Sequence, residues 1–457
     1  MKNLGLVFSL LLLVGCGGGG EKGPAEGPAK ARDEAKSEAP REDLKVYYDP
    51  PANTMLSEEG QTLDGLKTGL FTSWYQNGTI RNQGKYRKDL RVGKWKGWWD
   101  NGHERYEGDF EQGMKEGPWK FWDENGQLRF DGSYRADKQQ GHCTDWYPNG
   151  QKLDEGEMIA GQRDGAWTEW HETGTKRLEG TWVKGAPVGT HTMWHPGGEK
   201  QAVMTYEDGK QVGTSTGWHA NGQKAEEGAW EDGKRTGLWQ GWYDNGQLSS
   251  RGNFEAGMHQ GLHEAWYPDG TPQAKGSFVD DKRTGEWTLY FENGQVSSTG
   301  KYEDGKKTGP WIEYHENGQK RIEGSFEDNL PTGEWVYYHP NGEVFNKGKF
   351  EAGKHVGPWA SYFENGQMQS QGEFENDLPH GHWTYWFENG TKEGEGEMKA
   401  GKPDGPWKYW LEDGSPDLER TGIWVDGVKQ PAGSAEANSE SASESASESD
   451  EESGSDD

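Results

Sequence analysis

A glycine recurs at a fixed interval of 24 residues along this chain, and this period constrains the fold more than any other feature. A second glycine stands nine residues before each of these turn glycines, and the residue four before each is always Trp or Tyr. The fifteen turn glycines are Gly78, Gly102, Gly126, Gly150, Gly174, Gly198, Gly222, Gly246, Gly270, Gly294, Gly318, Gly342, Gly366, Gly390 and Gly414. No insertion interrupts the register, so the chain is an array of tandem repeats.

The composition by itself would suggest disorder. Only 30% of the residues are hydrophobic and 71 of the 457 are glycine, as in chains that cannot bury a core. The 25 tryptophans oppose this reading, because disordered chains are poor in aromatic residues. The chain is therefore interpreted as ordered repeats that pack on their neighbours rather than around one central core.

Each repeat has the sequence of a β-hairpin. The stretch Phe291 to Gly294 reads Phe-Glu-Asn-Gly, which suits a three-residue loop closed by a glycine with positive φ. The flanking residues are aromatic and β-branched and favour strands. Gly, Asp or Asn often stands eleven residues after the turn glycine, as at Gly113 and Asp137, and predicts a second left-handed turn. We expect an all-β, elongated, single-layer, solenoid-like array of about fifteen tandem 24-residue β-hairpin repeats.

Alternation along the strands predicts two aromatic faces. Given the bulged Asn-Gly loop, Trp98 shares a face with Phe110, which we expect to be the buried structural face, and Trp95 lies on the other face. The Trp95 row admits Cys143, His191, Ser215 and His263 in place of Trp, so we expect it to contact water and to bind the ligand. The candidate binding residues are Trp95, Trp119, Trp287, Trp311, Trp335, Trp359, Trp383 and Trp407.

The two ends of the chain differ from the array. Lys2 leads into a short apolar run from Leu4 to Val14, so we expect residues 1–15 to be a signal peptide. The sequence Leu13-Val14-Gly15-Cys16 resembles a lipobox, so we expect Cys16 to carry fatty acyl groups such as palmitate. We expect residues 16–43 to be a flexible tether, 44–66 a degenerate N-terminal cap repeat, 67–430 the array with a C-terminal cap, and 431–457 a disordered acidic tail of Ser and Glu.

The repeat resembles a known family. The pattern Gly-x-Trp-x-x-Trp/Tyr, then Asn-Gly-Gln, then Gly-x-Tyr/Phe, is similar to the MORN repeat in its bacterial variant form, from residue 69 to about 427. The resemblance implies an elongated sheet of hairpins that acts as a scaffold. Some variant-repeat proteins are labelled antitoxins, and eukaryotic members have been linked to phospholipid binding. The lipobox departs from the cytoplasmic setting of an antitoxin, and the net charge of -29 opposes binding to anionic membranes.

No catalytic motif stands out of the repeat, so we expect no enzyme activity, no cofactor and no metal site. His171, His195 and His219 recur at 24 residues, about 10 Å apart on neighbouring hairpins, which is too far to share one zinc ion. We interpret them as replacements for other aromatic residues, and Cys143 as a small buried residue. The acidic surface disfavours nucleic acid as a partner.

Two functions remain open from sequence. The first is a repeat scaffold for protein–protein interaction in the bacterial cell envelope, anchored to the outer membrane only through its lipid. The second is binding of a cell-wall glycan or other polysaccharide by stacking on aromatic side chains. An antitoxin-like role has less support.

Overall fold

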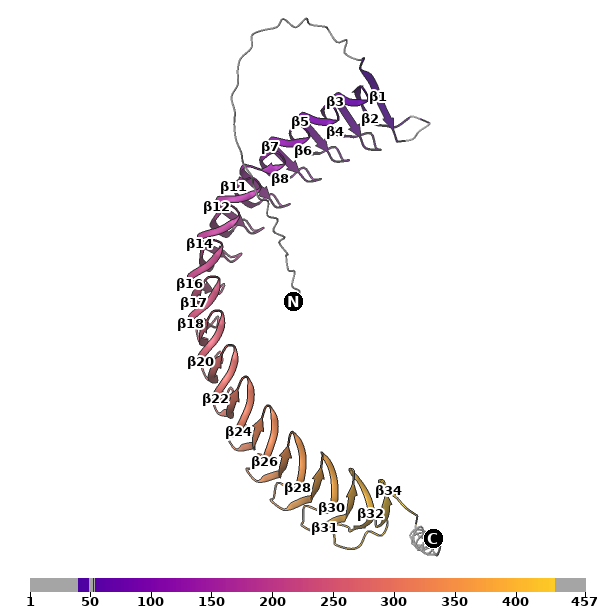
Figure 1. The fold of residues 1–457 in the computed structure, drawn as a ribbon, viewed down its shortest axis with the longest axis vertical. Coiled ribbons are helices and arrows are strands. Elements are labelled where there is room, and N and C mark those ends of the chain that lie inside the picture. Colours follow the sequence, from indigo (N-terminus) through magenta and orange to yellow (C-terminus); the bar gives the residue numbers. More distant parts are fainter. Residues whose placement is uncertain (1–39, 49–51, 53, 432–457) are drawn as a thin grey trace, which may run out of the picture.

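The computed structural model describes residues 40–48, 52 and 54–431. The signal peptide, Cys16, most of the tether and nearly all of the acidic tail lie outside these residues. The described chain forms one antiparallel sheet of 34 strands and contains no helix. Figure 1 shows that the sheet is a long ribbon that curves into a crescent. The expectation of an elongated, single-layer all-β array is confirmed.

The strands are β1 (Glu42–Tyr47), β2 (Leu56–Leu63), β3 (Leu66–Trp74), β4 (Ile80–Arg87), β5 (Leu90–Trp98), β6 (Glu104–Glu111), β7 (Met114–Trp122), β8 (Leu128–Arg135), β9 (Lys138–Gln139), β10 (Gly141–Trp146), β11 (Lys152–Ile159), β12 (Gln162–Trp170), β13 (Lys176–Val183), β14 (Ala186–Trp194), β15 (Lys200–Glu207), β16 (Lys210–Trp218), β17 (Lys224–Glu231), β18 (Lys234–Trp242), β19 (Leu248–Glu255), β20 (Met258–Trp266), β21 (Pro272–Val279), β22 (Lys282–Tyr290), β23 (Val296–Glu303), β24 (Lys306–Tyr314), β25 (Lys320–Glu327), β26 (Leu330–Tyr338), β27 (Val344–Glu351), β28 (Lys354–Tyr362), β29 (Met368–Glu375), β30 (Leu378–Trp386), β31 (Lys392–Lys399), β32 (Lys402–Tyr409), β33 (Gly422–Val425) and β34 (Val428–Lys429). Strands pair with their neighbours along the chain. The short β9 and β10 are two parts of one interrupted strand, and both pair with β8.

The Asn-Gly loop has the expected geometry. In the hairpin of β5 and β6, Trp99 N–H donates to the carbonyl of His103 at 2.8 Å, and Gly102 N–H donates to the carbonyl of Trp99 at 3.0 Å. Gly102 has φ 89°, a value that costs glycine little and other residues more. The Asn101 side-chain amide donates to the carbonyl of Glu124 in the next repeat at 2.7 Å. The loop therefore closes one hairpin and ties it to its neighbour.

The second turn is a two-residue connection. Glu111 pairs with Met114, and the intervening Gln112 and Gly113 both have positive φ, 49° and 83°. This is the conformation of a type I′ turn, whose twist matches that of the flanking strands. The expected second left-handed turn is confirmed, and it also joins repeats, because Gly113 N–H donates to the carbonyl of Arg91 at 2.9 Å.

The glycine nine residues before the turn glycine bends each long strand. All fifteen, from Gly69 to Gly405, have φ between 62° and 99° although they lie within strands. Gly117 of β7 shows the consequence, because the pairing of β6 with β7 skips from Gly108–Trp119 to Asp109–Glu116. A residue with a Cβ atom is strained at such a φ. The bulge explains why this position is always glycine.

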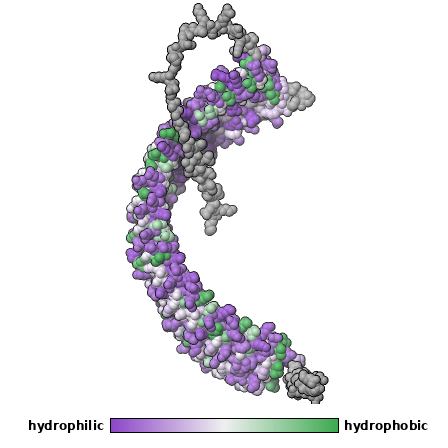
Figure 2. Space-filling model, viewed as in Figure 1, coloured by the Kyte–Doolittle hydropathy of each residue, from purple (hydrophilic) through white to green (hydrophobic). Residues whose placement is uncertain are grey.

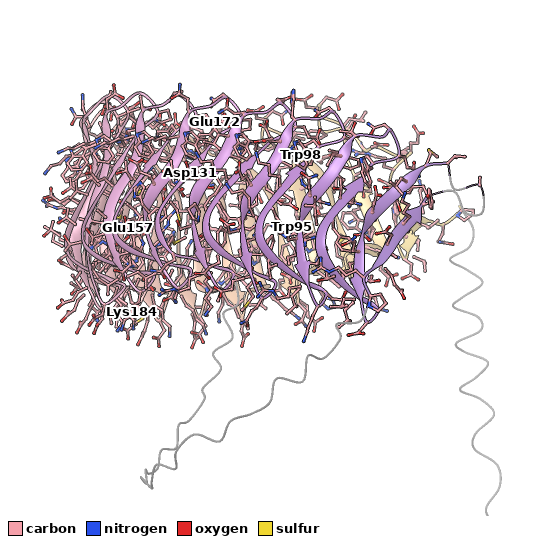
Figure 3. All side chains as sticks on the ribbon, turned by 90° about the horizontal axis from the view of Figure 1, so that it is seen from above. Trp95, Trp98, Asp131, Glu157, Glu172 and Lys184 are labelled. Carbon is pink, nitrogen blue, oxygen red and sulfur yellow. The ribbon has the colours of Figure 1, made fainter. Side chains whose placement is uncertain are left out.

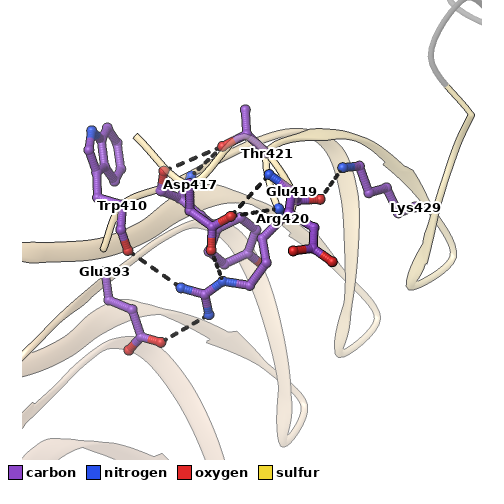
Figure 4. A network of polar contacts seen from close by, with 8 residues as sticks. Glu393, Trp410, Asp417, Glu419, Arg420, Thr421 and Lys429 are labelled. Carbon is purple, nitrogen blue, oxygen red and sulfur yellow. Dashed lines mark hydrogen bonds and ion pairs between the residues drawn. The ribbon is translucent and has the colours of Figure 1, made fainter. Parts of the chain in front are cut away.

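The two ends of the ribbon are built differently. At the N-terminal end β1 and β2 form an additional hairpin, and the Tyr48 hydroxyl donates to the carbonyl of Trp74 at 2.5 Å. At the C-terminal end a loop covers the last long strand. Figure 4 shows Arg420 in this loop, bonded to Asp417 at 2.8 Å and to Glu393 at 3.2 Å.

Candidate functional site

The tryptophans expected to bind a ligand form the core of the sheet. Trp95, Trp119, Trp287, Trp311, Trp335, Trp359, Trp383 and Trp407 are only 1% to 6% exposed. Their expected exposure, on which their assignment to a binding face rested, is wrong. Figure 3 shows Trp95 near the middle of a strand and Trp98 closer to the edge. We call the buried side of the sheet, which carries Trp95, Tyr106 and Phe110, the core face.

Each of these eight indole rings lies against a glycine of the preceding strand. A Cβ atom on Gly84 would come within 2.1 Å of the Trp95 ring. The indole N–H of Trp95 donates to the carbonyl of Lys85 at 3.1 Å, and the same bond recurs in most repeats. Tyr86 meets the ring edge-on at 5.0 Å between centroids, and the Arg91 guanidinium lies 4.5 Å from its centre. Glycine, carbonyl, aromatic ring and cation together seal the indole from water.

A further bulge, beside the Asn-Gly loop in every repeat but the last, explains the error. Trp98 pairs with Glu104, but Gly97 pairs with Tyr106, so Arg105 is an extra residue in the strand. Trp95 therefore lies opposite Gly108 and on the same face as Phe110. A shift of one residue exchanges the two faces of a strand. The Asn-Gly loop was interpreted correctly, and the additional bulge beside it reversed the assignment.

The opposite side of the sheet carries an aromatic row that remains partly exposed. We call this side the open face. In Figure 2 the surface of the ribbon is largely hydrophilic, with hydrophobic residues scattered along its length. The open aromatic row has one half-buried Trp or Tyr per repeat: Trp74, Trp98, Trp122, Trp146, Trp170, Trp194, Trp218, Trp242, Trp266, Tyr290, Tyr314, Tyr338, Tyr362, Trp386 and Trp410. The sequence interpretation had placed this row in the core.

Ion pairs flank the open aromatic row. Lys152 forms an ion pair with Glu155 at 2.5 Å, and its ammonium lies 5.4 Å from the centre of the Trp170 ring. The same pair recurs as Lys320–Glu323 at 2.8 Å. Hydrogen bonding to the lysine lowers the pKa of Glu323, and the same bond raises the pKa of Lys320. The open face thus combines aromatic rings with fixed charges of both signs.

The edge at the Asn-Gly loops is a ladder of hydrogen bonds between repeats. The Tyr75 hydroxyl donates to the carbonyl of Trp98 at 2.9 Å. His171, His195 and His219 occupy the equivalent position, each with Nε2 at 2.8 to 2.9 Å from a carbonyl of the next repeat. The interpretation of these histidines as aromatic replacements is confirmed. In Figure 3 this edge, marked by Glu172, is opposite the edge marked by Lys184.

One stretch of the core face is acidic. Asp145, Asp154 and Glu169 lie side by side on neighbouring strands. Arg163 bridges the last two, at 2.8 Å from Asp154 and 2.5 Å from Glu169, and Arg177 also binds Glu169. Burial, followed by the charge of Asp154, raises the pKa of Asp145 to about 6. The cluster fills a place that aromatic residues such as Phe121 occupy in the neighbouring repeat, which is a structural role.

The remaining candidates of chemical interest are internal. Cys143 is 1% exposed, and burial raises the pKa of its thiol. Within residues 40–48, 52 and 54–431 no three His, Cys, Asp or Glu side chains are arranged to hold a metal ion. The same residues contain no helix that is long and apolar enough to cross a membrane.

Comparison with known proteins identifies the repeat. The family model described as MORN repeat variant matches residues 67–88, 115–136, 235–256, 283–304, 307–328, 331–352, 356–376 and 379–400. No curated protein sequence matches the chain significantly.

Two similar solved structures are toxin complexes. The TcdB2-TccC3 structure is 12% identical over 85% of this chain and 24% of that one, with a TM-score of 0.14. The Photorhabdus luminescens Tc holotoxin pore is 12% identical over 86% of this chain and 24% of that one, also with a TM-score of 0.14. The chain thus spans about a quarter of the length of these proteins. Similarity at this level does not extend to the overall fold.

Proposed function

The chain is a protein of MORN repeat variants, and from this premise we propose that it is a non-catalytic scaffold that binds a protein partner along the open aromatic row. The observation that carries the proposal is the unbroken line of half-buried Trp and Tyr residues from Trp74 to Trp410. Interfaces between proteins are enriched in such residues. The tryptophan rings of the other aromatic face are buried against glycines, which leaves the open face for recognition.

The shape of the molecule suits an extended partner. Neighbouring rings of the row belong to hairpins about 10 Å apart, since two strands at roughly 4.8 Å separate them. Ion pairs of the Lys152–Glu155 type stand beside the rings in five repeats. A partner that runs along the ribbon would therefore meet the same combination of ring and charge several times. Repetition of modest contacts raises affinity through effective concentration.

We propose further that the scaffold is a lipoprotein of the outer membrane, attached through Cys16. The support is the apolar leader and the lipobox-like sequence Leu13-Val14-Gly15-Cys16. The expected tether, residues 16–43, would separate the array from the bilayer. Two or more acyl chains hold a protein stably in a membrane.

A pull-down from envelope extract tests the binding face. Tyr362→Ala with Trp386→Ala removes two adjacent rings of the open row, and we expect the partner to be lost. Interface aromatic residues typically contribute about 2 kcal/mol or more, which is roughly a thirtyfold change in affinity. The control is Glu316→Ala with Glu364→Ala, in exposed loops at the edge. Retention of the partner by the Tyr362/Trp386 variant, with the fold intact, would contradict the proposal.

A glycan of the cell envelope is the second candidate. It is favoured by the regular spacing of the rings and by the charged and polar groups beside them, because sugars stack on aromatic faces and form hydrogen bonds at their edges. Binding of purified peptidoglycan or polysaccharide by the wild type, with no protein retained in the pull-down, would favour this candidate. Loss of glycan binding in the Tyr362/Trp386 variant would then assign it to the same row.

A further inference from the structure

The first complete repeat reverses the charge of one edge of the ribbon. Residues 67–90 contain five basic side chains and only one acidic one. Lys67 forms an ion pair with Glu58 at 2.6 Å. Among residues 40–48, 52 and 54–431, no ion pair involves the other four basic residues, which are Arg81, Lys85, Arg87 and Lys88.

Among the repeats, only this one has two adjacent basic residues at these positions, because Arg135, Lys184 and Lys399 each stand beside an uncharged residue. Arg87 is the last residue of β4, and eight later repeats have glutamate in the same position: Glu111, Glu207, Glu231, Glu255, Glu303, Glu327, Glu351 and Glu375. Lys88 is the first residue of the following turn, where five later repeats have aspartate. Those aspartates are Asp208, Asp232, Asp280, Asp304 and Asp328. This edge is acidic in most repeats, and the first complete repeat places two adjacent cations on it.

The local surroundings leave these cations available. In three later repeats a lysine pairs with the turn aspartate, as in Lys210–Asp232 at 3.2 Å and Lys306–Asp328 at 3.4 Å. The residue that corresponds to this lysine in the first repeat is Leu66. Lys85, Arg87 and Lys88 are all exposed.

Apolar residues surround the cations on the open face. Lys85 pairs with Leu70 on one side and with Val92 on the other, and Arg87 pairs with Leu90. Leu70 is 56% exposed and Leu90 is 47% exposed. We call Leu70, Lys85, Arg87, Lys88 and Leu90 the basic patch. The basic patch combines positive charge with accessible apolar surface. These are the properties of a docking site for a peptide that contains acidic and small apolar residues.

The chain itself contains a segment of this kind. Residues 432–457 hold nine Asp and Glu residues and no Lys or Arg, with Ala between many of them. We propose that the basic patch binds the acidic segment 432–457 of a second copy of the chain, so that molecules associate head to tail. The proposal concerns a different surface from the open aromatic row and does not depend on it.

The length of the acidic segment indicates that it binds the basic patch of a second copy rather than the patch of its own chain. A segment of 26 residues reaches at most about 90 Å when fully extended. About 30 strands separate the first repeat from the last, roughly 140 Å along the sheet at 4.8 Å per strand, and Figure 1 shows the two ends far apart on the crescent. Because the contact joins two different surfaces, it leaves one free patch and one free tail on every pair and can extend into chains of molecules.

Sedimentation of the full-length protein in a non-ionic detergent tests the proposal. We expect association that grows with protein concentration in about 50 mM NaCl and disappears in about 500 mM, because screening weakens contacts between exposed charges. Truncation after Pro431 should abolish the association. A labelled peptide of residues 432–457 should bind the truncated protein, at least about tenfold more weakly at the higher salt concentration.

A matched pair of variants locates the contact. Arg87→Glu with Lys88→Asp introduces the residues that other repeats carry at these positions, so the hairpin should fold as before. This variant should lose self-association and bind the peptide at least about tenfold more weakly. Lys399→Glu with Ala400→Asp makes a similar charge change at the equivalent place of the next-to-last repeat, and it should change neither self-association nor peptide binding.

Four outcomes would overturn the proposal. The first is a monomeric wild type with no affinity for the peptide. The second is peptide binding that survives the Arg87/Lys88 change or is lost equally in the Lys399/Ala400 control. The third is a protein that binds the peptide yet stays monomeric at every concentration, which would place the tail on its own chain. The fourth is binding of anionic phospholipid vesicles, but not of the peptide, through Arg87 and Lys88.

Discussion

Met204 and Ser215 have exchanged the large and the small side chain of the repeat. In the other repeats, a glycine six residues after the turn glycine packs against a larger side chain eleven residues further along, which is usually Trp. Gly228 and Trp239 are one such pair. Met204 stands at the glycine position and Ser215 at the ring position. The Ser215 hydroxyl instead accepts a hydrogen bond from the indole of Trp230 at 2.8 Å.

The exchange predicts strong coupling between the two positions. Ser215→Trp alone should destabilise the protein by about 1–3 kcal/mol, because the new ring meets the Met204 side chain. Met204→Gly alone should also cost about 1–3 kcal/mol through the space it leaves. The double variant restores the usual pair, and we expect a favourable coupling energy of at least about 1 kcal/mol. Denaturant unfolding of the four proteins measures it, and additive effects would show that the two positions do not share one space.

The sequence predicts the architecture well because period and turn chemistry are local. Gly102 in the loop and Gln112-Gly113 in the second turn have the predicted conformations. Their register follows from an uninterrupted 24-residue period. A single hairpin of this polarity would be marginal, but neighbouring repeats bury each other's rings, and the pattern shows this directly.

The assignment of faces failed because the deciding bulge leaves no signature of its own. The extra residue is Arg105 in one repeat, and the same position is Leu153 or Ser249 in others. The bulge is stabilised by the fit of each tryptophan on a glycine, which is a contact between repeats. One signal could have found it, since a glycine stands in phase with the Trp95 position in nearly every repeat, as Gly108 does with Trp119, and glycine in a strand often marks the close approach of another group.

Three glycine substitutions should separate close packing from backbone strain. Gly324→Ala would place a Cβ atom 2.3 Å from the Trp335 ring and should cost the most, about 2–4 kcal/mol. Gly333→Ala has free space but φ 70°, so we expect about 1–2 kcal/mol. Gly217→Ala meets only the flexible Glu226 side chain at 3.1 Å and should cost least. Thermal unfolding gives the order, and equal effects at Gly324 and Gly217 would contradict the packing of the ring on glycine.

The buried acidic cluster makes stability depend on pH. The pKa of Asp145 rises from 3.8 to about 6 because of burial and the neighbouring Asp154, and Arg129 and Arg163 oppose this only in part. The folded protein therefore holds this proton more tightly than the unfolded chain. The resulting stabilisation is complete below pH 3.8 and is lost as the pH rises through about 6.

Asp145→Asn should remove the free-energy cost of burying an ionised carboxylate beside Asp154. We expect the variant to be more stable than the wild type by about 1–2 kcal/mol near pH 7.5, a figure reduced for partial exposure of the group, and to gain nothing near pH 4. Melting temperatures across this range test the prediction. Glu157→Gln, an exposed carboxyl of the same region, is the control. A variant less stable than the wild type at pH 7.5 would show that the ionised Asp145 is well paired.

The anchor can be tested independently of the array. Cys16→Ser removes the only thiol to which acyl groups can be attached at the lipobox, and the protein should move from the membrane pellet to the soluble fraction. Two acyl chains bind a bilayer far more firmly than one, so the change should be close to complete. Mass spectrometry of the wild type should show no residues 1–15. A wild-type protein that is soluble and begins at Met1 would contradict lipidation.

The two aromatic rows should respond to mutation in opposite ways. Trp335→Ala with Trp359→Ala empties two sites of the core face whose indole N–H groups bond to Ser325 and Lys349. Each change should cost about 3–5 kcal/mol, and the unfolding transition should shift strongly.

Tyr362→Ala with Trp386→Ala, on the open face, should leave that transition within about 1–2 kcal/mol of the wild type, because these rings are only half buried. Circular dichroism melts, run beside the pull-down, compare the two pairs. If the open-face pair unfolds the protein as readily as the core pair, the open row is structural. If the Trp335/Trp359 variant binds the partner less well but is as stable as the wild type, the core face takes part in recognition.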